Sequence, residues 1–270
     1  MITENTEIIP EPEITPAEPP VWGGWATFGL GAAIFAVSSI VQAVVMVVIV
    51  IWVYFAREAP LAGDSLEGLL TYFADLTVAY MGLIIAVTTI VSMLVSVGMI
   101  LLLIKAKRGA SIREYLALRP IGVGTVLWLV GAVVLLVLFS DLATATVPDP
   151  TSPDFMFDSY DTSVWPALFW VALVVGAPIA EEVIFRGFLF AGFVRSRLGL
   201  VGTIAITSLV WAVMHVQYEW QLIGSIFVIG VVFGYVRHRT RSLWATLLMH
   251  ALINLVAMFQ VAFGVERLLG

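Results

Sequence analysis

The amino-acid sequence predicts an all-α protein, a polytopic bundle of transmembrane helices, and three observations support this fold class. Of the 270 residues, 61% are hydrophobic and only 12% are charged, and the mean hydropathy is +1.04. A soluble domain, by comparison, is about half apolar and about a quarter charged. The apolar residues gather in long runs, most of which reach the ~20 residues needed to cross ~30 Å of hydrocarbon. The basic residues are concentrated in the loops between alternate runs.

Seven apolar runs are expected to form membrane-spanning helices, and the first is long enough that dividing it would give an eighth. The sixth run is short for a span. The runs cover about 25–55, 78–104, 123–145, 165–194, 200–217, 221–236 and 243–263. We divide the chain into an acidic, proline-rich tail over 1–22, which is expected to be disordered, an N-terminal helical region over 23–164, and a C-terminal core over 165–263.

The distribution of charge predicts how the helices are oriented. Ten of the thirteen basic residues fall in three loops, between 105 and 122, after 194 and after 236, which alternating helices place on one side. The opposite side receives mainly acidic residues. The positive-inside rule then predicts a cytoplasmic N-terminus in a multi-pass protein of the plasma membrane. No basic face is large enough to bind nucleic acid, and the lack of cysteine excludes disulfides and thiolate ligands.

The predicted fourth helix contains three charged residues, Glu181, Glu182 and Arg186. A charge near the centre of a bilayer costs at least ~3 kcal/mol, so such residues usually face a protein interior. Glu182 and Arg186 are four residues apart and are predicted to pair. Glu181 is rotated by ~100° from its neighbour and is expected to project into a cavity. Pro178 removes a backbone donor just upstream and predicts a kink. A buried ion pair that only fixes helix packing is the alternative interpretation.

Polar residues also occur in the fifth and seventh predicted helices. His215 ends the fifth, with Trp211 one turn before it, and His250 and Asn254 lie four residues apart in the seventh. At 1.5 Å per residue these side chains reach the same depth as Glu181, so we expect them to converge on one cavity. The alternatives are a histidine that only packs and hydrogen bonds that only join helices, because lipid offers polar groups no partners.

This combination of residue types suits hydrolysis. A carboxylate beside an imidazole activates water, and an imidazole with an amide stabilises an oxyanion. Glu181, His215 and His250 are also a candidate set of zinc ligands, although the chain lacks the His-Glu-x-x-His helix of common zinc proteases. There is no serine nucleophile elbow, and Asp141 is the only aspartate near a helix core, so serine and aspartyl mechanisms are disfavoured.

Three helical motifs, in their order and separation, resemble the signature of the CAAX protease and bacteriocin-processing (CPBP) family, also called the Abi family. The resemblance covers about 165–260, with Trp211 where the family usually has Phe. It implies an intramembrane endopeptidase, of a type also described as a metalloendopeptidase, acting on a membrane-embedded or lipid-anchored protein or peptide within the bilayer. The motifs here are Glu181-Glu182-x-x-x-Arg186, Trp211-x-x-x-His215 and His250-x-x-x-Asn254.

The resemblance also implies roles for these residues. Water activation falls to Glu181 and His215, oxyanion binding to His250 and Asn254, and support of the glutamate face to Glu182, Arg186 and Trp211. The family has been described both as metal-dependent and as using water activated by glutamate alone, so Zn²⁺ stays an open alternative. A non-catalytic membrane scaffold or immunity protein is the second hypothesis. A transporter is the third, disfavoured because the two halves show no inverted repeat.

Overall fold

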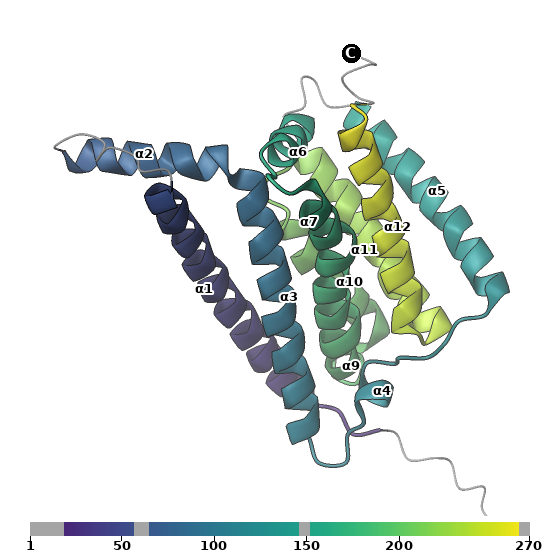
Figure 1. Ribbon diagram of the computed structural model, residues 1–270. Coiled ribbons are helices and arrows are strands. Elements are labelled where there is room, and N and C mark those ends of the chain that lie inside the picture. Colours follow the sequence, from purple (N-terminus) through teal and green to yellow (C-terminus); the bar gives the residue numbers. More distant parts are fainter. Residues whose placement is uncertain (1–18, 57–64, 146–151, 265–270) are drawn as a thin grey trace, which may run out of the picture.

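The computed structural model describes residues 19–56, 65–145 and 152–264, and the expected disordered tail therefore lies largely outside the described residues. Within these ranges every regular element is a helix, and Figure 1 shows the long helices running up and down in one bundle. The all-α, polytopic fold class is confirmed. The N-terminal helices are α1 (Gly24–Ala56), α2 (Leu66–Ala79), α3 (Met81–Ala106), α4 (Ile112–Tyr115), α5 (Val123–Ala145) and α6 (Ser152–Asp161).

The C-terminal half contains the remaining elements, and the fourth expected helix is one continuous but irregular segment. It consists of α7 (Pro166–Val171), the π-helix η1 (Ala172–Gly176), α8 (Ala177–Glu182), the π-helix η2 (Val183–Leu189) and α9 (Phe190–Phe193). After it come α10 (Gly199–Val213), α11 (Trp220–Thr240) and α12 (Leu243–Ala262).

All seven expected apolar runs are helical, but six, not seven, are long and apolar enough to cross a membrane among the described residues. The exception is α10, whose 15 residues span only ~22 Å. This helix ends at Val213, so His215 lies in the turn that follows and not in the helix as expected. The first run is one unbroken helix, and α11 is longer than the short sixth run predicted.

Two further differences concern the ends of the N-terminal helices. The short helix α2 was not expected, and it lies across the end of α1 (Figure 1), so the helix expected from 78 begins at Met81. At the other end of α1, Trp22 was assigned to the tail, yet its indole Nε1 donates to the Leu103 carbonyl at 3.2 Å. Residues 19–22 therefore adjoin the bundle.

The fourth segment occupies the centre of the bundle. Its Phe185 and Phe188 are fully buried and pack in one core with Ile104 of α3, Phe233 of α11 and Met249 of α12. The outer helices α1 and α5 instead expose many large apolar side chains. A helix that is apolar on all sides is typical of a membrane span. The multi-pass integral membrane character is confirmed, and the charged motif lies on one of the two most buried spans, the other being α11.

Candidate active site

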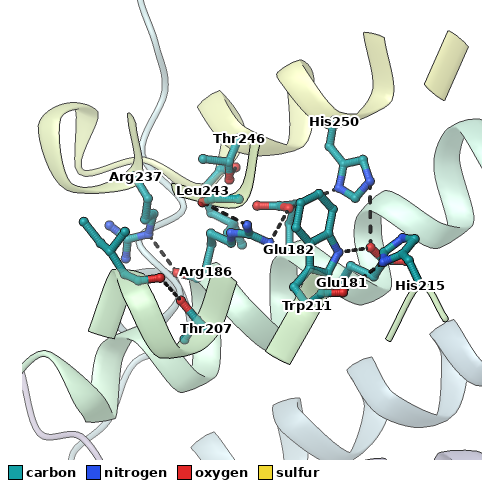
Figure 2. Close-up of polar contacts among 12 residues, drawn as sticks. Glu181, Glu182, Arg186, Thr207, Trp211, His215, Arg237, Leu243, Thr246 and His250 are labelled. Atoms are coloured by element: carbon teal, nitrogen blue, oxygen red, sulfur yellow. Dashed lines mark hydrogen bonds and ion pairs between the residues drawn. The ribbon is translucent and has the colours of Figure 1, made fainter. Parts of the chain in front are cut away.

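The predicted pair of Glu182 and Arg186 forms a buried ion pair. Arg186 Nη1 lies 3.2 Å from Glu182 Oε1, and the two side chains are 1% and 0% exposed. The same Oε1 atom lies 3.1 Å from Nδ1 of His250 on α12. Because a carboxylate oxygen accepts, Nδ1 of His250 is the donor in this contact. Figure 2 shows this chain of contacts from Arg186 through Glu182 to His250.

The guanidinium of Arg186 is surrounded by aromatic rings. Its central carbon lies 4.6 Å from the centre of the Trp211 ring and 5.4 Å from that of Phe233. Its Nη2 donates to the Gly230 carbonyl at 3.2 Å. A cation over an aromatic face is stabilised by about 0.5–2 kcal/mol. Arg186 thus joins the fourth segment to α10 and α11 while compensating the charge of Glu182.

Glu181 differs from its neighbour, as the helix geometry predicted. Its side chain is 23% exposed, and Oε2 lies 3.8 Å from His250 Nε2. The indole Nε1 of Trp211 donates to the same oxygen. The Glu182 carboxylate is therefore held inside the protein by Arg186, and the Glu181 carboxylate reaches a cavity beside His250. Figure 2 shows the two pairs. The aromatic residue of the second motif contacts both sides of this arrangement, since its ring covers Arg186 and its N–H binds Glu181.

His215 is oriented by the backbone of the preceding turn. Its Nδ1 lies 2.9 Å from the Trp211 carbonyl, and a carbonyl can only accept, so Nδ1 carries the proton. In the neutral ring the other nitrogen, Nε2, is then an acceptor. The His215 ring also lies close to the Trp211 ring, with 5.4 Å between the ring centres.

Asn254 is positioned by an irregularity in the fourth segment. The Ala177 N–H bonds to the carbonyl five residues back, Ala172, and the next N–H in this pattern would belong to Pro178, which has none. The Leu173 carbonyl is thereby left without a helical donor, and Asn254 Nδ2 donates to it at 2.8 Å. The expected disturbance at Pro178 is a π-helical turn, and π-helical turns are frequent at functional sites.

A second carbonyl is used in the same way at the end of η2. The Phe190 N–H bonds to Phe185, five residues back, and a return to α-helical bonding after such a step passes over one carbonyl, that of Arg186. Arg237 Nε donates to it at 2.9 Å. Arg237 was predicted to lie in a loop, but it is in the last turn of α11 and only 7% exposed. Its position in the sequence, among other arginines, gave no signal of this burial.

A cavity of about 490 Å³ joins these groups. Its volume lies within the range of small-ligand sites. Of the predicted site residues, Glu182 and Arg186 are buried and do not line the cavity. Those that line it are Glu181, Trp211, His215, His250 and Asn254. Sequence reasoning missed Tyr218, whose hydroxyl donates to Met156 Sδ at 3.4 Å. Burial raises the pKa of this phenol in the turn before α11, which keeps it a donor.

The candidate zinc ligands are not assembled as a metal site in this arrangement. Among the described residues, no group of three His, Asp or Glu side chains is placed to hold a metal ion. Nδ1 of His215 and Nδ1 of His250 bind a carbonyl and Glu182, which is the usual second contact of a metal-binding histidine and leaves Nε2 for a ligand. The Trp211 N–H occupies Oε2 of Glu181. Glu181, His215 and His250 are therefore not gathered as a three-ligand site, and a zinc ion would need the three side chains to move closer together.

Comparison with known families agrees with the motifs. Residues 163–256 match the model of the family described as type II CAAX prenyl endopeptidase Rce1-like. This region is similar to the Rce1-like family. All three motifs lie inside the Rce1-like region, and the resemblance to CAAX proteases is confirmed. No curated protein and no solved structure matches the chain. The Rce1-like region contains the whole polar cluster, on the fourth segment, α10 and α12.

Proposed function

We propose that this protein is an intramembrane endopeptidase that hydrolyses a peptide bond of a membrane-embedded or lipid-anchored protein or peptide. The observation that carries the proposal is the position of Glu181, which lines the cavity 3.8 Å from His250. General bases are required to lie within reach of the attacking water. An endopeptidase family for residues 163–256 supports the same reaction class.

In the proposed reaction Glu181 takes a proton from water as the water oxygen attacks the peptide carbonyl carbon. His215 assists with Nε2, the acceptor that remains when Nδ1 donates to the Trp211 carbonyl. The proton then passes from Glu181 to the leaving nitrogen as the C–N bond breaks, which yields a carboxylate and an amine. These bond changes and proton transfers are complete without a metal ion.

The negative oxygen of the tetrahedral intermediate needs donors. In the proposed reaction both nitrogens of the His250 ring carry a proton. Nδ1 donates a hydrogen bond to Glu182, and Nε2 donates one to the oxyanion. Asn254 uses one N–H for the Leu173 carbonyl, and an amide nitrogen has a second to give. Glu182 and Arg186 hold His250 in place. They are positioning residues and do not contact the substrate.

We also propose that the protein lies in the plasma membrane with its N-terminus in the cytoplasm. The support is the grouping of ten basic residues at one end of the bundle, in the loops and the adjoining helix turns. Charged loops of this kind are retained in the cytoplasm.

The test is cleavage of a membrane-tethered peptide library by the purified full-length protein. We expect Glu181→Gln and His250→Gln to lose at least about 100-fold in rate, since general acid–base catalysis contributes about 10²–10⁴. Glu67→Gln, on α2 and outside the cavity, is the matched control. A correctly folded Glu181→Gln variant that cleaves like the wild type refutes the assignment.

Two further outcomes decide between alternatives. Loss of cleavage with a chelator, restored by zinc, would establish a metal enzyme, for which the three candidate ligands must rearrange. A folded wild-type protein that cleaves no member of the library would support the second hypothesis, a non-catalytic scaffold or immunity protein.

A further inference from the structure

The cavity beside Glu181 extends toward one end of the bundle. Beyond the motif residues, its lining comes from α3, the first half of the fourth segment and α11 as far as Phe233, and from the C-terminal ends of α5 and α12, α6 and the turn before α11. Figure 1 shows that α6 and the ends of α5 and α12 lie together, at the end of the bundle where α2 is also found. The lining residues at this end include Asp141, Thr144, Phe155, Met156, Ala257 and Gln260.

Toward the opposite end the site is closed. The lining includes no residue of the segment 182–193 and none of α12 before His250. Below Glu181 lie the fully buried side chains of Phe185, Phe188 and Met249, together with the Arg186 guanidinium at 1% exposure. Among the described residues, the cavity therefore reaches the α6 end, where the exposed Asp141 lines it, and meets a packed layer toward the α4 end.

The two ends carry opposite charges. The α4 end holds the loops with Lys107, Arg108, Arg195 and Arg241, which follow α3, α9 and α11. The α6 end holds acidic residues on α2, α6 and the turn before α11, and the cavity lining contains no lysine or arginine among the described residues. Under the positive-inside rule the closed end is cytoplasmic and the open end faces the opposite side of the membrane.

Asp141 is the carboxylate at the open end of the cavity. Its two oxygens accept from the Gln260 amide at 3.3 and 3.4 Å. This partner is neutral, and none of the ion pairs among the described residues involves this exposed carboxylate. A carboxylate at the edge of an apolar cavity favours a ligand with a cationic group, because opposite charges steer and orient a partner.

We propose that the substrate enters this site from the non-cytoplasmic side of the membrane and is a peptide with a cationic group, which Asp141 binds at the cavity mouth. The substrate class rests on the proposed function. The side of entry does not, because it follows from the cavity and the charge distribution alone.

The side of entry is testable without any cleavage, because the chain has no cysteine. Single cysteines are placed in the cavity (Ala257→Cys), on the basic end (Arg108→Cys) and on the exposed surface of α5 (Val134→Cys). Intact cells are treated with a charged, membrane-impermeant thiol reagent. We expect Ala257→Cys to react from outside, Arg108→Cys only after permeabilisation, and Val134→Cys, which faces lipid, in neither case. Labelling of Arg108→Cys in intact cells with Ala257→Cys protected overturns the proposal, as does equal labelling of both.

The preference for a cation is tested with pairs of cleaved peptides that differ only by Lys or Gln near the cleavage site. We expect Asp141→Asn to lower kcat/KM for the Lys peptide about tenfold, the effect of losing one hydrogen bond to a charged group, and to leave the Gln peptide unchanged. Asp75→Asn on α2, outside the cavity lining, should change neither. An equal loss for both peptides overturns the role of Asp141. Failure of cleavage in the wild type would refute the proposed function, while the labelling result would still decide the side of entry.

Discussion

Removal of one partner of the buried pair should destabilise the protein more than removal of both charges. In Arg186→Met the Glu182 carboxylate, 0% exposed, loses the guanidinium 3.2 Å away. Breaking a buried pair from one side costs about 3–5 kcal/mol, because an uncompensated charge stays inside. The substitution also removes the contact with the Trp211 ring at 4.6 Å and the donor to the Gly230 carbonyl. We expect a loss of about 3–5 kcal/mol in the free energy of unfolding.

The double variant Glu182→Gln/Arg186→Met separates charge from packing. The glutamine oxygen still accepts from His250 Nδ1, which is 3.1 Å from Glu182 Oε1, and no buried charge is left unpaired. We expect this variant to recover at least roughly half of the loss, since replacing both members of a buried pair is often nearly neutral. The assay is unfolding in mixed micelles titrated with denaturing detergent and followed by fluorescence of the nine tryptophans. The reasoning is refuted if the single variant is as stable as the wild type, or if the double variant is no more stable than the single one.

Three further changes test other parts of the structure. Gly230→Ala places a methyl group 2.9 Å from Ser208 Cβ, so we expect overpacking of α10 against α11 to lower the free energy of unfolding by about 1–3 kcal/mol; an unchanged detergent midpoint contradicts this. Pro178→Ala supplies an N–H for the Leu173 carbonyl, to which Asn254 now donates. We expect the rate of cleavage to fall while the free energy of unfolding is unchanged. Full activity would show that this contact does not position the Asn254 amide. Burial raises the pKa of Tyr115 to about 12, so its contribution to stability should be complete below pH 10 and lost between about pH 10 and 12; a Tyr115→Phe variant with the same alkaline unfolding curve would contradict it.

The sequence by itself determined six of the seven expected membrane spans, the segregation of charge and the three motifs. These are local properties, because the length of an apolar run and the cost of a charge in lipid depend on nearby residues only. The pairing of Glu182 with Arg186 followed from their spacing of four, and the different environment of Glu181 followed from a rotation of one residue. The catalytic roles of these residues stay predictions.

Only the tertiary structure decided which backbone acceptors were left for side chains from other helices. The Leu173 carbonyl takes Asn254, 81 positions away, and the Arg186 carbonyl takes Arg237, 51 positions away. Both acceptors exist because a π-helical turn passes over one carbonyl, and no periodicity in the sequence marks such a turn. The early end of α10 and the position of α6 likewise depend on packing between distant segments. Among the described residues, the cavity reaches the acidic end of the bundle and meets a packed layer toward the basic one.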